Sequence, residues 1–105
     1  ESELIGLGLL DKHDVANQHP DYPLYKKYFM HGTSHHLGID VHDYGNWYAP
    51  MKEGNVFTVE PGIYILEENL GIRIENDVVI TSDGIDDLMH DIPIEVEEIE
   101  GIMNS

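Results

Sequence analysis

Apolar and polar residues alternate most clearly in the second half of the chain, where they predict strands. Residues 56–60 (Val-Phe-Thr-Val-Glu) and residues 63–66 (Ile-Tyr-Ile-Leu) are rich in β-branched and aromatic side chains, which favour strands. Pro61 between them predicts a kink or bulge, because proline cannot donate a ladder hydrogen bond. After a turn, residues 72–80 carry the longest strand signal, and a second turn at residues 81–84 closes it.

The two ends of the chain predict short helices. Residues 3–10 predict the end of an amphipathic helix, and a second short helix begins after Asp11, whose side chain is suited to an N-cap. Residues 19–23 contain two prolines and predict an extended loop. Residues 95–103 predict a last helix, because apolar residues recur there on one helical face.

Residues 28–45 mix apolar residues with histidines and glycines, and we expect short strands broken by Gly32 and Gly38. Together these elements predict the α+β class, with an antiparallel sheet and helices at its margins. The 105 residues suffice for one small domain. The chain begins at Glu1 without a methionine, which we interpret as a piece of a longer protein, with a processed terminus as the alternative.

Charge and composition narrow the possible partners. Five Lys and Arg residues stand against 21 Asp and Glu residues, a formal charge of −16. This balance argues against nucleic acid, which needs basic groups, and fits a cationic ligand such as a metal ion or a peptide ammonium group. An acidic surface that serves only solubility is the alternative. No apolar run approaches the roughly 20 residues of a membrane span.

The chain has no cysteine, so a metal would have to bind to His, Asp and Glu. Four histidines, His31, His35, His36 and His42, lie within 12 positions. Imidazole is a common metal ligand and acid–base group. The cluster therefore indicates either a metal site or a set of surface and hydrogen-bonded histidines, and the spacing alone leaves both open.

Carboxylates in two strand segments are the second group of candidates. Glu60 ends an apolar strand, where burial would require a compensating partner. Strand alternation places Arg73, Glu75 and Asp77 on one face and the neighbouring isoleucines on the other. That charged face either meets water or forms a site. One histidine and two carboxylates are a plausible set for a hard divalent metal.

Three motifs resemble those of the Xaa-Pro aminopeptidases, which are pita-bread metallopeptidases. Residues 31–43, HGTSHHLGIDVHD, resemble the pattern HGxSHxLGLDVHD with Ile39 in place of leucine. Residues 58–62 match TVEPG, and residues 71–81, GIRIENDVVIT, resemble GIRIEDDIVIT with Asn76 in place of an acid. The likeness covers residues 24–103 well and the preceding residues only loosely.

The resemblance implies a pita-bread fold and a centre with two divalent metal ions, manganese first and cobalt or zinc as alternatives. His35 and Glu60 would bind one metal, and Glu75 would bridge both. His31 and His42 would contact the substrate or the tetrahedral intermediate, Arg73 would hold Glu75, and Glu60 would also transfer a proton to the departing nitrogen. We expect the remaining histidines to be non-ligands: His36 by its variable place in the motif, and His13, His19 and His90 at the surface.

Asp40 and Asp43 are candidates either to orient the histidines or to close a neighbouring turn. The resemblance also implies two aspartate ligands upstream of the first histidine. The three aspartates that precede His31 lie in no apolar strand; they are Asp11, Asp14 and Asp21. We therefore interpret residues 1–105 as the C-terminal part of a pita-bread catalytic domain whose upstream half is absent. Alone, it is expected to bind metal weakly and to have no peptidase activity.

The function that the resemblance implies for the parent protein is release of the N-terminal residue from peptides with proline in the second position. We also expect a cytoplasmic homo-oligomer that has no membrane or nucleic-acid partner. A prolidase, which cleaves only Xaa-Pro dipeptides, is the first alternative, and Ser34 favours the aminopeptidase over it. The second alternative is a non-catalytic pita-bread binding domain.

Overall fold

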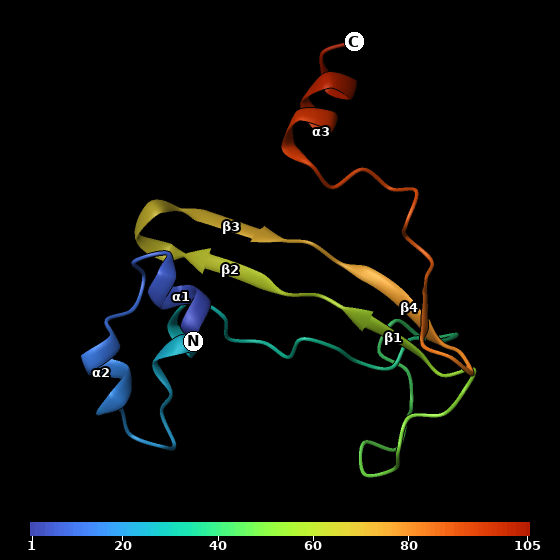
Figure 1. The fold of residues 1–105 in the computed structure, drawn as a ribbon, viewed down its shortest axis with the longest axis horizontal. Coiled ribbons are helices and arrows are strands. Elements are labelled where there is room, and N and C mark those ends of the chain that lie inside the picture. The colour runs from blue at the N-terminus through green and yellow to red at the C-terminus, as the bar shows by residue number, and fades with distance from the viewer. The chain divides into compact units, whose positions relative to one another are not determined.

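The structure is a computed structural model that describes residues 1–105, and the chain divides into two compact units. Unit 1 consists of Glu1–Gly32 and Gly62–Arg73, and unit 2 consists of Thr33–Pro61 and Ile74–Ser105. Helices and antiparallel strands occur together (Figure 1), as the predicted α+β class requires. None of the three α-helices has the length and apolar composition that crossing a membrane would require.

Unit 1 contains two short helices and a two-stranded ribbon. Its elements are α1 (Ser2–Gly6), α2 (Lys12–Ala16), the 3₁₀ helix η1 (Leu24–Lys27), β2 (Gly62–Ile65), the 3₁₀ helix η2 (Leu66–Glu68) and β3 (Leu70–Arg73). The two strands are antiparallel, with Gly62 opposite Arg73. Asn69 has a φ of 51°, and this left-handed conformation closes the turn into β3. Leu4 and Tyr28 are the buried apolar side chains of this unit.

The first helix is shorter than residues 3–10, because a glycine ends it. Gly8 has a φ of 74°; the Leu9 N–H donates to the Leu4 carbonyl at 2.9 Å, and the Gly8 N–H to the Ile5 carbonyl at 3.0 Å. This pair of bonds is a Schellman motif, which stops a helix and satisfies its last carbonyls. The second helix begins as predicted, since the Asp11 carboxylate accepts the His13 N–H at 2.7 Å.

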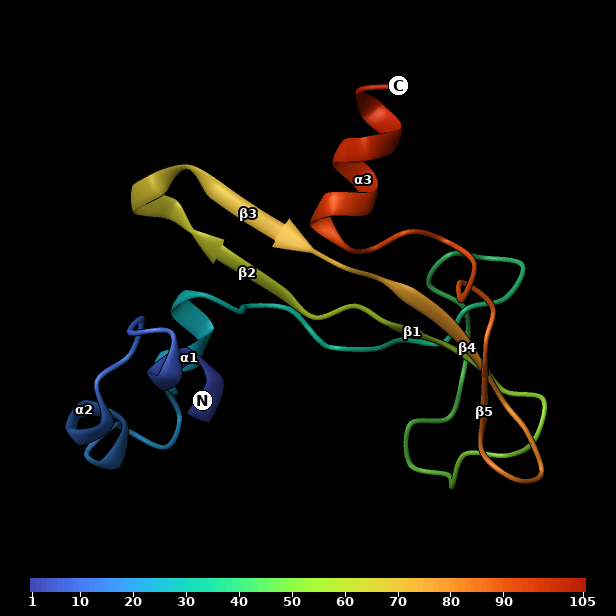
Figure 2. The ribbon, with the colours of Figure 1, turned by 45° about the horizontal axis from the view of Figure 1, so that its top comes forward.

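Unit 2 contains a three-stranded antiparallel sheet in the order β1-β4-β5 and a C-terminal helix. Its elements are β1 (Val56–Val59), β4 (Asn76–Ile80), β5 (Ile85–Asp87) and α3 (Val96–Met103); Figure 2 shows β5 along β4. Phe57 lies opposite Val78, and both are buried. The helix at the C-terminus was predicted, but its apolar residues are all exposed.

Three sequence-based expectations are wrong in detail. Residues 72–80 form two strands rather than one, because Ile74 and Glu75 lie in neither, and Ile74 instead donates to the Pro61 carbonyl at 3.3 Å. Residues 19–23 are not extended: the Tyr22 N–H donates to the His19 carbonyl at 3.0 Å and forms a turn. Residues 28–45 contain no strand, and their one β-bridge pairs His36 with Phe57.

Candidate metal centre

The segment 33–37 lies along β1 and places His35 beside Thr58. Three backbone bonds hold it: Leu37 N to Val56 O at 3.1 Å, Thr58 N to His35 O at 3.0 Å, and Glu60 N to Thr33 O at 2.7 Å. Successive residues of an extended chain point to opposite faces. Thr58 and Glu60 therefore share the face on which His35 lies.

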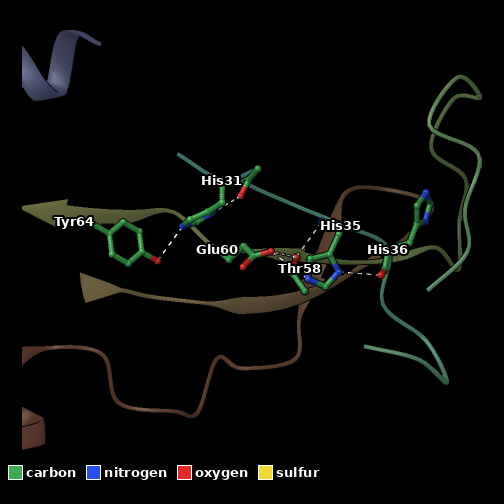
Figure 3. Close-up of polar contacts among 7 residues, drawn as sticks. His31, His35, His36, Thr58, Glu60 and Tyr64 are labelled. Carbon is green, nitrogen blue, oxygen red and sulfur yellow. Dashed lines mark hydrogen bonds and ion pairs between the residues drawn. The ribbon is translucent and has the colours of Figure 1, made fainter. Parts of the chain in front are cut away.

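His35, Glu60 and Glu75 are brought together in unit 2. Each offers one ligand atom, and these atoms all lie within 4.8 Å of one another. The His35 ring lies beside the Glu60 carboxylate (Figure 3). Its Nε2 is 3.1 Å from a carboxylate oxygen, and the two side chains are 18% and 13% exposed. Two atoms bound to one metal at about 2.1 Å and at right angles are about 3 Å apart. The spacing therefore fits ligands that share a cation.

The hydrogen bond on the far side of the His35 ring determines which nitrogen faces Glu60. The Nδ1 lies 3.0 Å from the His36 carbonyl. A carbonyl only accepts, so Nδ1 carries a proton, and Nε2 is the nitrogen that can share a cation with Glu60. A lone pair and a carboxylate in contact repel each other unless a proton or a metal ion lies between them. The donor set therefore fits a divalent cation.

Thr58 connects His35 and Glu60, two of the three candidate ligands. Its side chain is only 1% exposed; its hydroxyl donates to the Glu60 carboxylate at 3.2 Å and accepts the His35 backbone N–H at 3.1 Å. Both bonds are visible in Figure 3. Thr58 was not among the predicted site residues, although the sequence carries a signal for it: it is a polar position in an apolar strand, two residues before Glu60.

His42 lies against the ligand cluster. Its ring centroid is 4.5 Å from that of His35, with the ring planes 60° apart, and its side chain is exposed. His42 therefore lies beside His35, one of the candidate ligands, in unit 2. Its role in the reaction stays a prediction.

His31 belongs to unit 1 and makes its own contacts there. Its Nδ1 lies 2.7 Å from the Gly32 carbonyl, so this nitrogen carries the proton and Nε2 accepts from the Tyr64 hydroxyl at 3.0 Å. Phe29 packs edge-on against the ring at 4.9 Å. Sequence reasoning missed Tyr64, because nothing in the strand pattern indicates that it pairs with a histidine 33 residues away.

The other candidates have contacts of different kinds. Arg73 is exposed and is the last residue of β3. Its predicted place beside Glu75 stays a prediction. The Asp43 carboxylate accepts the Tyr44 N–H at 2.7 Å, which supports the turn interpretation, and Asp40 is exposed.

The His36 ring packs on the rings of Phe57 and Trp47, with centroids 4.5 and 4.9 Å away. As expected, the remaining histidines are at the surface; they are His13, His19 and His90.

None of the upstream aspartates lies on a strand. Asp11 caps α2, Asp14 lies within that helix, and Asp21 is exposed in the turn beside His19. All three belong to unit 1. The ligand atoms that the structure groups in unit 2 therefore come from one histidine and two glutamates.

Comparison with known proteins gives consistent matches. The model of metallopeptidase family M24 matches residues 6–82. The Xaa-Pro aminopeptidase of Escherichia coli (strain K12) is 40% identical over 116 residues, which cover 97% of this chain and 25% of that protein. Xaa-Pro aminopeptidase 3 of Rattus norvegicus is 46% identical over 88 residues, which cover 73% of this chain and 17% of that protein.

Solved structures agree in fold. Zinc-substituted Escherichia coli aminopeptidase P in complex with product matches with a TM-score of 0.82 and 37% identity, over 98% of this chain and 26% of that one. Proline aminopeptidase P II from Yersinia pestis matches with a TM-score of 0.80 and 35% identity, over 98% of this chain and 26% of that one. These matches confirm the expected pita-bread fold class. The chain spans about a quarter of the length of the Escherichia coli enzyme.

Proposed function

We propose, because this chain belongs to metallopeptidase family M24, that it supplies part of the metal centre of an aminopeptidase. The substrate would be a peptide with proline in the second position, from which the N-terminal residue is released. The observation that carries the proposal is the meeting of three ligand atoms, from His35, Glu60 and Glu75, within 4.8 Å. The names of the relatives, Xaa-Pro aminopeptidases, support the substrate class.

The proposed cofactor is a pair of divalent ions, with manganese first and cobalt or zinc as alternatives. Two carboxylates favour a hard ion such as manganese, whereas the imidazole is also compatible with cobalt and zinc. His35 and Glu60 would hold one ion, and the two oxygens of the Glu75 carboxylate suit a bridge to the second. When bound, such a pair lowers the pKa of a shared water and polarises the scissile carbonyl.

The residues of this chain would hold groups and move protons around that centre. Glu60 would deliver a proton to the departing proline nitrogen. His42, whose ring lies against that of His35, would donate a hydrogen bond to the developing oxyanion. His31 would contact the substrate, with its ring held by the Tyr64 hydroxyl, and Arg73 would hold Glu75.

The ligand set of this chain is partial. The proposed centre needs two more carboxylates, and the three aspartates before His31 are engaged in a helix and a turn. We therefore expect the 105-residue chain alone to bind manganese weakly and to hydrolyse no peptide. Isothermal titration with manganese and a hydrolysis assay test this, and tight binding of two ions with turnover would contradict it.

The test of the function uses the whole protein that carries this chain. We expect His35→Ala to lower manganese affinity by more than the roughly 10–100-fold typical of residues that only orient ligands, and to abolish hydrolysis. His90→Ala, which changes an exposed histidine of the same unit, is the matched control and should behave as wild type. Full function with His35→Ala, and no metal in the wild type, would favour the non-catalytic binding domain instead.

Substrate length separates the aminopeptidase from the prolidase. We expect cleavage of Xaa-Pro tripeptides and longer peptides as well as dipeptides, whereas a prolidase would cleave only the dipeptides. A cytoplasmic location and a homo-oligomeric state complete the proposal. Cell fractionation and light scattering of the whole protein test these two points.

A further inference from the structure

We propose that Thr58 is a positioning residue that locks His35 and Glu60 into one geometry through a single buried hydroxyl. This inference rests on the proposed metal centre and adds a residue to it. Thr58 touches neither the substrate nor the metal in this proposal. It acts through the two ligands, by fixing the backbone of one and the carboxylate of the other.

The Thr58 hydroxyl takes the place of the backbone carbonyl that would accept the His35 N–H in a regular antiparallel pair. The Thr58 N–H donates to the His35 carbonyl at 3.0 Å, as in an antiparallel pair. In a regular pair the returning N–H would go to a backbone carbonyl, but the His35 N–H is accepted by the Thr58 hydroxyl at 3.1 Å. A side-chain atom thus takes part in holding the histidine backbone.

The Thr58 hydroxyl oxygen also carries one hydrogen, which it donates to Glu60. Because its lone pair accepts from His35, the hydroxyl hydrogen is available for the Glu60 carboxylate at 3.2 Å. That carboxylate oxygen is also the atom 3.1 Å from the His35 Nε2. The hydroxyl therefore holds the Glu60 oxygen at the ring nitrogen, and a shift of one ligand is transmitted to the other.

Burial makes this arrangement rigid. Thr58 is 1% exposed, so water does not compete for its hydroxyl. Ligands that are held before the ion binds lose less entropy on binding. Thr58 should therefore raise metal affinity without being a ligand.

The test compares Thr58→Val and Thr58→Ser in the whole protein. Valine keeps the shape and removes the hydroxyl, whereas serine keeps the hydroxyl and removes the methyl group. We expect the Kd for manganese, measured by isothermal titration, to rise about 10–100-fold with valine and to stay near wild type with serine. The hydrolysis rate should follow the same order. In the metal-free protein, hydrogen exchange of the His35 amide should accelerate with valine only.

Thr81→Val is the matched control. The Thr81 hydroxyl also donates to a carboxylate two residues later, that of Asp83 at 3.1 Å, but it lies in an exposed turn. Its removal should leave the Kd for manganese unchanged. Circular dichroism of each variant verifies that it is folded.

Equal manganese affinity for a folded Thr58→Val and the wild type would overturn the inference, and so would equal weakening by valine and serine. If Thr58→Val does not fold, Thr58→Ser and Thr58→Ala replace it, because both lack the methyl group and differ only in the hydroxyl. Equal affinities for those two variants would also overturn the inference. A wild type that binds no manganese would instead overturn the proposed function, and this inference with it.

Discussion

Two of the three antiparallel strand pairs of the chain, β1–β4 and β2–β3, differ in what holds them. In the β1–β4 pair, Phe57 lies opposite Val78 and both are buried, beside the buried Thr58. In the β2–β3 pair, all four residues of β3 are exposed, and Ile72 is 64% exposed. The first pair buries an apolar side chain from each strand, whereas in the second pair β2 is part-buried and β3 is exposed.

The buried side chains of β1 and β4 provide the place where the chain can hold candidate ligands by itself. His35 and Glu60 are attached to β1, the strand with its own buried side chains. Isolated two-stranded ribbons are marginally stable in water, so the contacts of β2 and β3 depend more on single polar bonds. Substitutions in the two pairs should therefore differ in size and in kind.

The largest effect is expected from Phe57→Ala. Truncation of a buried phenylalanine costs about 3–5 kcal/mol, and here it also removes the packing surface of the His36 ring. Chemical denaturation of the whole protein measures the loss. We expect manganese affinity to fall as well, since Phe57 adjoins Thr58 in β1.

Ile72→Ala is the counterpart in the ribbon. Because Ile72 is exposed in this chain, its truncation should change the free energy of unfolding by no more than about 0.5 kcal/mol. A loss as large as that from Phe57→Ala would contradict the difference in apolar burial between the two strand pairs. It would show that another part of the whole protein covers β3.

The next largest effect on stability is expected from Asn76→Asp in β4. The Asn76 amide donates to the Asp87 carboxylate at 2.7 Å, so an aspartate there would lose the donor and set two carboxylates in contact. We expect a loss of about 1–3 kcal/mol in the free energy of unfolding. The double variant Asn76→Asp with Asp87→Asn exchanges donor and acceptor and should recover most of it. Failure to recover would mean that the amide has another function at this place.

The three candidate ligands could be predicted from the sequence, whereas the strand break and the backbone pairing around them could not. Spacing alone left open whether His35, Glu60 and Glu75 meet, and it was the resemblance of the three motifs to the Xaa-Pro aminopeptidases that implied their joint site. The break at residues 74–75 was missed because alternation continues through it in the sequence. Only the pairing of Ile74 with the Pro61 carbonyl, a contact 13 positions apart, reveals it. Alternation predicts which face a residue occupies and says nothing of where pairing stops.

The hydrogen-bond partners of the histidine side chains could not be predicted from the sequence either. The motif indicated that His31 and His42 matter, but it did not indicate the Tyr64 hydroxyl that His31 meets. Such a contact depends on which segment of unit 1 lies beside β2. A tyrosine in an apolar strand is equally well explained by packing, so its hydroxyl gave no signal.

A smaller effect is expected from Tyr64→Phe in β2. The change removes the hydroxyl that donates to the His31 Nε2 at 3.0 Å and keeps the ring that packs against the histidine at 5.4 Å. The free energy of unfolding should fall by about 0.5–1.5 kcal/mol. Tyr25→Phe, a neighbouring tyrosine of unit 1, serves as the control. A larger loss of hydrolysis than of stability would indicate that His31 acts on the substrate.

The smallest effect is expected from the Lys27–Glu67 ion pair of unit 1. The two groups are 2.7 Å apart and about half exposed. Their hydrogen bond lowers the pKa of Glu67 below its usual 4.5 and raises the pKa of Lys27 above its usual 10.5. The pair therefore stabilises the ribbon between these values, and its contribution disappears as the pH falls through the lowered Glu67 pKa or rises through the raised Lys27 pKa.

Exposed pairs are weak and screened by salt. We therefore expect Glu67→Gln to lower the melting temperature slightly at neutral pH and low salt, and to have no effect in high salt. The exposed Glu68→Gln, which changes the adjacent residue of η2, controls for the loss of one negative charge from an acidic chain. Equal effects of the two variants would mean that net charge, rather than the pair with Lys27, contributes the stability. An effect of Glu67→Gln that persists in high salt would mean that this end of the ribbon is shielded from solvent in the whole protein, and the contrast between the two strand pairs would then be smaller than this chain alone indicates.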